Sequence, residues 1–533
     1  MVLIPKRKAS GIRLSQCLPI FLVAIVSLNV LIVGWWMNKE QSLAKPPNEF
    51  ETFASEKPMQ RQTVTKLPPL VPVVPVVDVT KQDQHVVDTD MMKQANADVV
   101  DVSPDESVAA GAVARSDNKA DAPVVVAHVV SLIKCSKSVT GFLDAAAVFR
   151  HSIHQQSFST GKSKYSYKMY AIVHEQCQDH GQILERLGYT VLVKPPPIRV
   201  DEIQEGWYRN HVENENCCGS AEFIKLYAYE LMDHEIVVHW DMDVAVLQSM
   251  DDLFDAMLFD KDSKEGRAAR ERLEVQHPSQ PLPDKIDAYF TRDVTSAQPW
   301  ESAQGVQGGF LVARPSRENF QTYLNFIRLG NYTAGRGDGT GWNALGYGGF
   351  QGAMAYQGVV AFFYDHFKPN TAVELAACRW NQVVADVLWR GPAKMQHHLQ
   401  CREHPKDGNY EANTKCEDCR VTPIELVKTV HYTACKKPWE CSLPTPRVPR
   451  NKEHIYRLSH LTNVTTCGRL FAKWFELRSD LEQQLKEHHQ YKPADHEGSF
   501  EPDYFMGYCQ RAGGYIPMNP PPDGFDMKEL YGI

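Results

Sequence analysis

The sequence has no surplus of positive charge. Its 57 Lys and Arg are outnumbered by 65 Asp and Glu, and the formal net charge is -8. Proteins that bind the phosphates of nucleic acids are rich in Lys and Arg, so this composition gives no indication of nucleic-acid binding. Internal repeats are also lacking. The 533 residues therefore have room for one large domain with accessory segments, or for two to three ordinary domains.

A second pair of cysteines with metal-ligand spacing is missing as well. Cys416 and Cys419 have the spacing of half a zinc site, but structural zinc sites of this kind use two such pairs. The other candidate zinc ligands nearby are Cys401, His397, His398 and His404. Thirteen cysteines are too many to be accidental buried thiols. In an oxidising compartment disulfides are the better interpretation, and the sequence does not give their connectivity.

One long apolar run lies near the N-terminus. It extends from Cys17 to Met37 without a charge and follows four basic residues. About 20 apolar residues span a bilayer, and basic residues before the span place the N-terminus in the cytoplasm. We therefore expect a cytoplasmic tail (1–16) and a transmembrane signal-anchor (17–37) of a single-pass type II protein of the Golgi or ER membrane. The alternative is a signal peptide cleaved near Ala44, whose apolar core would normally have only about 7–15 residues.

Composition divides the rest of the chain. Residues 38–121 are rich in Pro, Val and Asp and lack a lasting apolar period, which predicts a disordered stem. Residues 122–467 are predicted to form the main domain, and 468–533 a C-terminal helix and tail. In a lumenal domain, the sequons at Asn331 and Asn463 are candidate glycosylation sites, which would make the protein a glycoprotein.

Strand and helix patterns alternate at the start of the main domain. Strands are expected at 124–133, 165–173 and 189–193, with helices at 139–152 and 181–187 between them. This alternation is typical of βαβ units around a parallel sheet. Later helices are expected at 220–232, 317–329 and 471–487, and a charged surface insertion at 260–280.

Two carboxylates interrupt a later apolar strand. The run 235–247 is β-branched and short, as in a buried strand, yet it contains Asp241 and Asp243. Unpaired carboxylates are too costly to bury, so we expect both at the end of the strand, facing something positive. In open α/β sheets ligands bind at that edge, and divalent cations prefer carboxylate oxygens and bridge to phosphates. A D-x-D site for a metal and a diphosphate is the hypothesis; an acidic cap of the next helix is the plain alternative.

A second group of polar residues lies far downstream. His431 can complete the shell of a divalent cation as a neutral imidazole, and Lys437 can place a positive charge on a diphosphate. Residues 335–352 contain eight glycines, which fits a mobile loop or a close backbone approach to a ligand.

Three features in this order resemble the glycogenin-like glycosyltransferases, glycosyltransferase family 8. The first combines Phe223–Tyr227 with the D-x-D strand Val238–Asp243, the second is Gln307–Val312, and the third is the segment His431–Trp439. Together they span most of the predicted main domain, and their shared order is more specific than any one of them.

The resemblance implies a fold, a reaction and a cofactor. The fold would be α/β of the GT-A type, a Rossmann-like mixed sheet with helices on both faces. The reaction would be retaining transfer of a sugar from a UDP-sugar to a hydroxyl of a glycan or glycoprotein. The cofactor would be Mn²⁺ or another divalent cation on the D-x-D motif.

The resemblance also assigns roles to residues. Asp241, Asp243 and His431 would bind the metal, with Asp241 also close to the donor ribose. Lys437 would contact the diphosphate, and Lys225 matches a lysine near the donor sugar. The remaining predicted donor-binding positions are Gln307, where the family usually has Asn, and Gly309.

The chain departs from the family pattern in two places. Ala434 replaces a glycine whose backbone lies against the phosphates. The family's G-D-Q-G element is blurred, because Gly349–Gly352 has Phe350 in place of the acid. We favour Gln351 as the sugar-facing residue, with Asp338 as a second candidate.

The resemblance leaves alternatives for mechanism and function. We expect front-face attack by the acceptor hydroxyl, assisted by the departing phosphate, rather than a covalent sugar on a side-chain nucleophile. One rival function is a non-catalytic carbohydrate-binding or scaffold protein on the same fold. The other is a metal-dependent nucleotidyl or phosphoryl transferase.

Overall fold

A computed structural model of the chain describes residues 122–135, 139–215, 218–276, 281–293, 305–383, 399–401, 416–419, 422–433, 435–441, 466–487, 507–509, 514–525 and 527–531. The predicted tail, anchor and stem (1–121) and the zinc candidates His397, His398 and His404 lie outside them. Within these ranges no helix is long and apolar enough to cross a membrane. The fold-class prediction is corrected in this respect: the described residues support its α/β part and provide no transmembrane helix. The longest described α-helix, the 22-residue α13 (Thr466–Glu487), is amphipathic: it buries one face and carries charges on the other.

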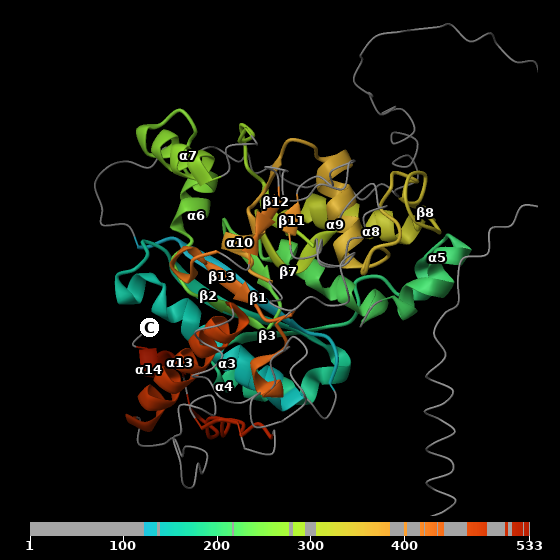
Figure 1. Cartoon of the computed structure of the whole chain (residues 1–533). Coiled ribbons are helices and arrows are strands. Elements are labelled where there is room, and N and C mark those ends of the chain that lie inside the picture. The colour runs from blue at the N-terminus through green and yellow to red at the C-terminus, as the bar shows by residue number, and fades with distance from the viewer. Residues whose placement is uncertain are drawn as a thin grey trace, which may run out of the picture. The chain divides into compact units, whose positions relative to one another are not determined.

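The centre of the fold is a seven-stranded sheet with the order β10-β6-β7-β4-β1-β2-β3 (Figure 1). Its strands are β1 (Val125–Leu132), β2 (Ser166–His174), β3 (Thr190–Lys194), β4 (Val237–Trp240), β6 (Ala288–Arg292), β7 (Val306–Ala313) and β10 (Ala372–Glu374). All neighbouring strands are parallel except β7, which is antiparallel to both β4 and β6. The sheet is thus mixed, as predicted.

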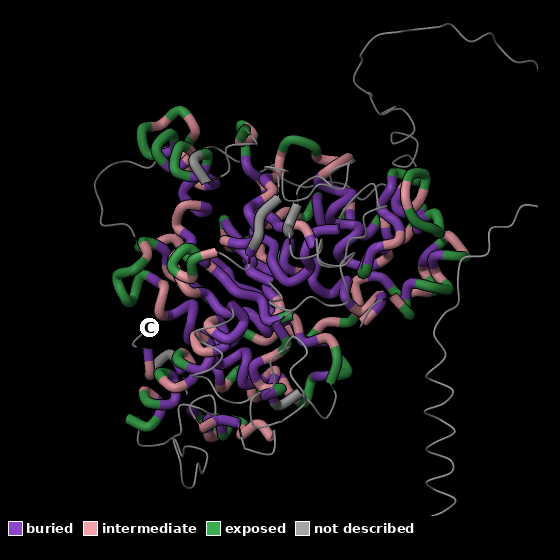
Figure 2. The backbone as a smooth tube through the Cα atoms, in the orientation of Figure 1, coloured by how far each residue is buried: buried purple, intermediate pink, exposed green. Residues whose placement is uncertain are grey.

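Helices cover both faces of the sheet, and its central strands are buried between them (Figure 2). Successive side chains of a strand point to opposite faces, so β1 sends Val126 and Val130 into one core and Ala127 and Val129 into the other. The first core includes α3 (Val139–Gln155), α4 (Gly181–Arg186), α6 (Asp251–Leu258), α7 (Lys264–Gln276) and residues of α13 and α14 (Met527–Tyr531). The second includes α8 (Arg317–Leu329), α9 (Tyr356–Phe362) and the 3₁₀ helix η6 (Gly219–Glu230).

Short elements complete the described chain. The remaining strands are β5 (Val244–Val246), β8 (Tyr332–Thr333), β9 (Gly341–Trp342), β11 (Leu399–Cys401), β12 (Cys416–Asp418) and β13 (Thr429–His431). The remaining α-helices are α5 (Gly206–His211) and α10 (Ala377–Trp380). The 3₁₀ turns are η2 (Phe158–Thr160), η3 (Glu175–His180), η4 (Val200–Glu202), η5 (Val212–Asn214), η10 (Ile424–Leu426) and η11 (Pro438–Glu440), and η7 (Phe363–Phe367) is a π-helix.

Two predicted elements differ from the structure. The single strand expected at 235–247 is two strands, β4 and β5, because Asp241 to Asp243 form a turn and β5 pairs with β13 outside the main sheet. The helix expected at 220–232 is η6, a 3₁₀ helix. The sequence could not distinguish the two helix types, because apolar residues three positions apart share a face in both.

Four disulfides lie in the described part of the chain: Cys135–Cys177, Cys378–Cys419, Cys435–Cys467 and Cys441–Cys509. The second bond engages one of the three cysteines considered as zinc ligands, which argues against the zinc interpretation. The last two bonds tie Cys435, within the His431–Trp439 segment, to α13, and Cys441, just after that segment, to the C-terminal segment.

We expect the Cys435–Cys467 bond to stabilise the domain. Replacing both cysteines by Ser opens a loop with a sequence separation of 32 residues, which should lower the free energy of unfolding by about 2–4 kcal/mol. Urea unfolding of the wild type and of the double variant measures this difference. The difference should disappear when both proteins are unfolded in a strong reductant. Equal stability without reductant would contradict the expectation.

Candidate metal centre

The site forms at the edge of the sheet where the parallel strands end. Asp241 follows β4 directly, and its amide donates to the carbonyl oxygen of Gly309 at 3.1 Å because β7 is antiparallel and starts at this edge. The turn then brings Asp243 to the start of β5. The antiparallel partner of β5 is β13, which places His431 opposite Val244. Three chain segments thus meet at one point.

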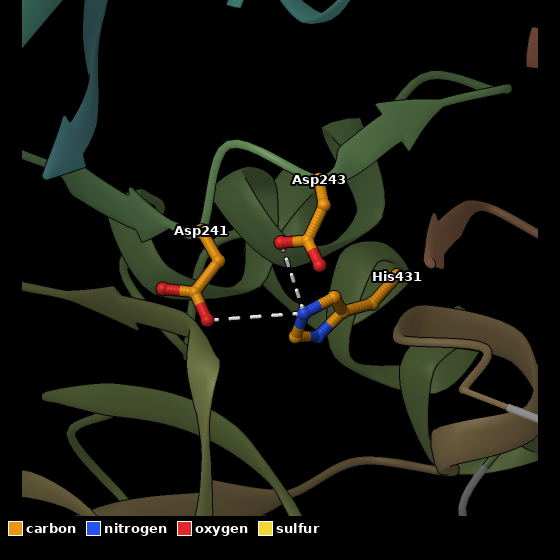
Figure 3. A group of neighbouring side chains, drawn as sticks. All are labelled: Asp241, Asp243 and His431. Atoms are coloured by element: carbon orange, nitrogen blue, oxygen red, sulfur yellow. Dashed lines mark ion pairs between the residues drawn. The ribbon is translucent and has the colours of Figure 1, made fainter. Parts of the chain in front are cut away.

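Asp241, Asp243 and His431 point toward one another (Figure 3). His431 Nε2 lies 3.8 Å from Asp241 Oδ2 and 3.3 Å from Asp243 Oδ1. The prediction that His431 folds back onto the two acids is therefore confirmed. Metal binding itself stays a prediction.

The three side chains fit a divalent cation. One ligand atom from each lies within 4.8 Å of the others, and Asp243 and His431 are buried while Asp241 is partly exposed. Two carboxylates and an imidazole are a donor set that suits Mn²⁺ and similar hard or borderline cations. Of the two ring nitrogens of His431, Nε2 is the one that faces the carboxylates. The other nitrogen, Nδ1, is buried and has no hydrogen-bond partner among the described residues.

A lysine lies beside each carboxylate. Lys225 Nζ donates to Asp241 Oδ1 at 3.0 Å and to the carbonyl oxygen of Gly308 at 3.1 Å, and Lys437 Nζ contacts Asp243 Oδ2. Burial would lower the pKa of Lys225, but Asp241 and Glu222 outweigh it and raise that pKa above its usual value. Burial would raise the pKa of Asp241, but mainly Lys225 and His431 lower it to about 2. Both groups are therefore charged at neutral pH.

The protonation states predict how metal affinity depends on pH. Burial lowers the pKa of His431 below its ordinary value, although Asp241 and Asp293 oppose this shift. A lowered pKa means that the imidazole stays neutral, and able to bind a metal, to a lower pH than a free histidine does. We expect calorimetry to find almost the same Mn²⁺ affinity at about pH 7.5 and pH 6.5, with a loss at lower pH. A fall of tenfold or more between these two values would contradict this expectation.

Gly309 supplies the close backbone approach that the site requires. A Cβ atom at this position would lie 2.5 Å from His431 Cε1 and 2.8 Å from Asp241 Oδ2. The residue therefore forms one wall of the site without a side chain. Its place next to the predicted metal ligands is consistent with the predicted donor-binding role, which stays a prediction.

Gln307 lies at the start of the same strand. Its Oε1 accepts from the amide of Gly309 at 2.8 Å and from Asn381 Nδ2 at 3.2 Å. This fixes the carboxamide with its oxygen toward the backbone. Its Nε2 has no hydrogen-bond partner that the described residues provide, so it can donate to a ligand.

Sequence reasoning missed Gln357 as a site residue. It is buried at the start of α9, its Nε2 donates to Asp293 Oδ2 at 3.2 Å, and its side chain packs against Gly308. Asp293 is buried directly after β6, and its charge acts on His431 by opposing the lowering of that residue's pKa. The sequence carries no signal for Gln357, because the burial of one amide at a helix start shows only in the structure.

The structure shows no contact between the remaining predicted site residues and Asp241, Asp243 or His431 in the described part of the chain. Gln351 has an exposed side chain, and its carbonyl oxygen accepts from Gln357 Nε2 at 3.1 Å. Asp338 is exposed between β8 and β9. Ala434 lies outside the described residues. Their proposed roles stay predictions. Trp439 packs on Gly141 and Phe142, so its ring stabilises the start of α3.

No family model and no curated protein matches this chain. Several solved structures are similar to it. Mouse xyloside xylosyltransferase 1 has 12% identity and a TM-score of 0.30, with 57% of this chain and 97% of that chain covered. The galactosyltransferase LgtC, solved with donor and acceptor sugar analogues, has 12% identity and a TM-score of 0.32, with 67% and 96% covered. The glycosyltransferase GlyE of Streptococcus pneumoniae has 11% identity and a TM-score of 0.33, with 70% and 66% covered.

All three structures are named as glycosyltransferases, the class that the sequence motifs resemble. Their TM-scores lie below 0.5, so the function of this chain has to be inferred from its own sheet and site.

Proposed function

We propose that this protein is a retaining glycosyltransferase that moves a sugar from a UDP-sugar to a hydroxyl of a glycan or glycoprotein. The observation that carries the proposal is the convergence of Asp241, Asp243 and His431, with a lysine on either side, at the carboxyl edge of the sheet. Such a site combines a metal-binding donor set with fixed positive charge, which suits a diphosphate leaving group.

Each charged group has a task in this reaction. Negative charge grows on the UDP oxygens as the glycosidic bond breaks, so groups that bind this charge stabilise the transition state more than the ground state. Mn²⁺ held by Asp241, Asp243 and His431 would act as a Lewis acid toward the diphosphate. Lys437, which contacts Asp243, is placed to bind the same oxygens.

The other lysine orients the site. Lys225 is buried and holds Asp241 by an ion pair of 3.0 Å, which fixes the direction of that carboxylate. Gln307 and Gln357 lie on this side and are placed to hydrogen-bond the donor sugar. The acceptor hydroxyl attacks from the face that the leaving UDP vacates, with the departing phosphate taking its proton; this front-face course retains the anomeric configuration.

We also propose that the domain works in the lumen of the Golgi or ER. Four disulfides among the described residues support this, because such bonds persist in oxidising compartments.

A donor panel tests the proposed function. The protein is incubated with UDP-glucose, UDP-galactose, UDP-xylose and UDP-N-acetylglucosamine, and released UDP is measured with Mn²⁺ and with EDTA. We expect hydrolysis or transfer of at least one donor with Mn²⁺ and its loss with EDTA. No release of UDP from any donor, in a preparation whose folding is shown by circular dichroism, would overturn the proposal. A covalent sugar adduct on a side chain, detected by mass spectrometry, would overturn the front-face mechanism.

A further inference from the structure

Polar side chains without free positive charge line the Lys225 side of the metal centre. We call Lys225, Glu222, Asp293, Gln307 and Gln357 the sugar-side cluster. All five are buried, and the cluster contains two carboxylates, two carboxamides and one ammonium group. Its position follows from the topology: Asp293 ends β6 and Gln307 begins β7, at the edge where Asp241 ends β4.

The lysine of this cluster is already neutralised. It pairs with Asp241 at 3.0 Å. Glu222 precedes it by three residues in η6, and residues three apart in a 3₁₀ helix lie one above the other. Glu222 accordingly contributes to the raised pKa of Lys225. One ammonium thus faces two carboxylates.

The neighbouring cations are paired as well. Arg292, next to Asp293, is bound by two nitrogens to the carboxylate of Asp365 at 2.7 and 2.9 Å and by a third to Glu374 at 3.2 Å. Lys437 contacts Asp243 across the metal centre. In the described part of the chain, each of these three site cations therefore has a carboxylate partner.

We propose that the site selects a nucleotide-sugar donor whose sugar is uncharged and rejects a donor that carries a uronic acid. This inference rests on the proposed function, and it assigns the discrimination to Asp293 and Glu222.

Hydrogen bonding and charge both favour an uncharged sugar. Sugar hydroxyls can donate to the Asp293 carboxylate and to Gln357 Oε1, and they can accept from Gln307 Nε2. Gln357 Nε2 already donates to Asp293 and to the Gln351 carbonyl. The carboxylate of a uronic acid can only accept, and it would stand close to Asp293 and Glu222 in a partly dehydrated site. Like charges that are close together repel, and burying a carboxylate without a cation adds a desolvation cost. A tenfold preference needs only about 1.4 kcal/mol, well within this range.

A comparison of donors tests the inference. Release of UDP from UDP-glucose, UDP-galactose and UDP-xylose is compared with release from UDP-glucuronate, at saturating Mn²⁺. In parallel, binding of each donor is measured by calorimetry. We expect kcat/KM for UDP-glucuronate to be lower than that of the best neutral donor by about 100-fold or more.

Charge-neutral variants assign the effect to residues. Asp293→Asn keeps an oxygen for Gln357 and removes the charge, and it should raise the relative kcat/KM of UDP-glucuronate by about tenfold. Glu222→Gln is the second variant and should act in the same direction. Glu265→Gln, an exposed acid of α7, is the control and should leave the donor ratio unchanged.

The outcomes separate the two proposals. If no donor binds and none is hydrolysed, the proposed function fails. If UDP-glucuronate is used within threefold of the best neutral donor, only the present inference fails. If the wild type discriminates but neither variant changes the ratio, the assignment to Asp293 and Glu222 is overturned.

Discussion

Replacing Asp243 by Asn should reduce sugar transfer by about 10²–10³-fold, the range for losing one charged group that stabilises a transition state. The carboxylate of Asp243 is buried, faces His431 Nε2 at 3.3 Å and contacts Lys437, so the substitution removes a predicted metal ligand and the partner of a lysine together. The neutral amide nearly keeps the shape of the carboxylate, so the loss reports charge more than packing. Released UDP at saturating donor, and Mn²⁺ affinity by calorimetry, measure the effect.

A matched control separates the effect of losing a metal ligand from the effect of changing the net charge. Asp233 is an exposed acid just before β4, at the opposite end of the same strand. Asp233→Asn changes the net charge equally and should leave both activity and Mn²⁺ affinity unchanged. Wild-type activity of Asp243→Asn would contradict the proposed metal centre. Urea unfolding of both variants shows whether a lost activity reflects the site or the fold.

Replacing Gly309 by Ala should damage the metal centre without removing any ligand. The added methyl group would lie within 3 Å of both His431 and Asp241, so one of them has to move. Overpacking of this kind costs about 1–3 kcal/mol of stability, and displacing a catalytic group by about 1 Å can cost 10²-fold in rate. We expect a loss of activity of about 10²-fold, with Mn²⁺ affinity reduced in parallel.

The control for this substitution is Gly206→Ala. A Cβ atom there would lie 3.8 Å from Nη2 of Arg209, in ordinary contact, and this glycine has no left-handed backbone conformation. This variant should retain full activity and stability. If Gly309→Ala bound Mn²⁺ as tightly as the wild type and kept its activity, the contacts of Gly309 with the two ligands would be irrelevant to function.

The sequence predicted the main strands and helices within a few residues. Alternating apolar runs and amphipathic segments specified β1, α3, β2, α4 and β3, because side-chain period reflects which face is buried. The resemblance to family 8 also predicted that His431 would join Asp241 and Asp243 as a metal ligand. The transmembrane helix is a prediction that the described structure does not support.

The sequence did not show which residues belong to the sugar-side cluster. Gln351 and Gln357 are six positions apart, close to a glycine-rich stretch, and only the structure shows that Gln357 is buried against Gly308 and Asp293. A single amide in such a segment has no periodic signal that reveals its direction.

The sequence by itself determined the chemistry of the site: a D-x-D turn after a buried strand, and a histidine and a lysine six residues apart. The tertiary structure alone decided which further residues share the site. An antiparallel β7 brings Gly309 to the end of β4, and an antiparallel β13 brings His431 to the start of β5. Pairing between distant strands depends on the packing of the whole sheet, so local sequence patterns cannot specify these contacts.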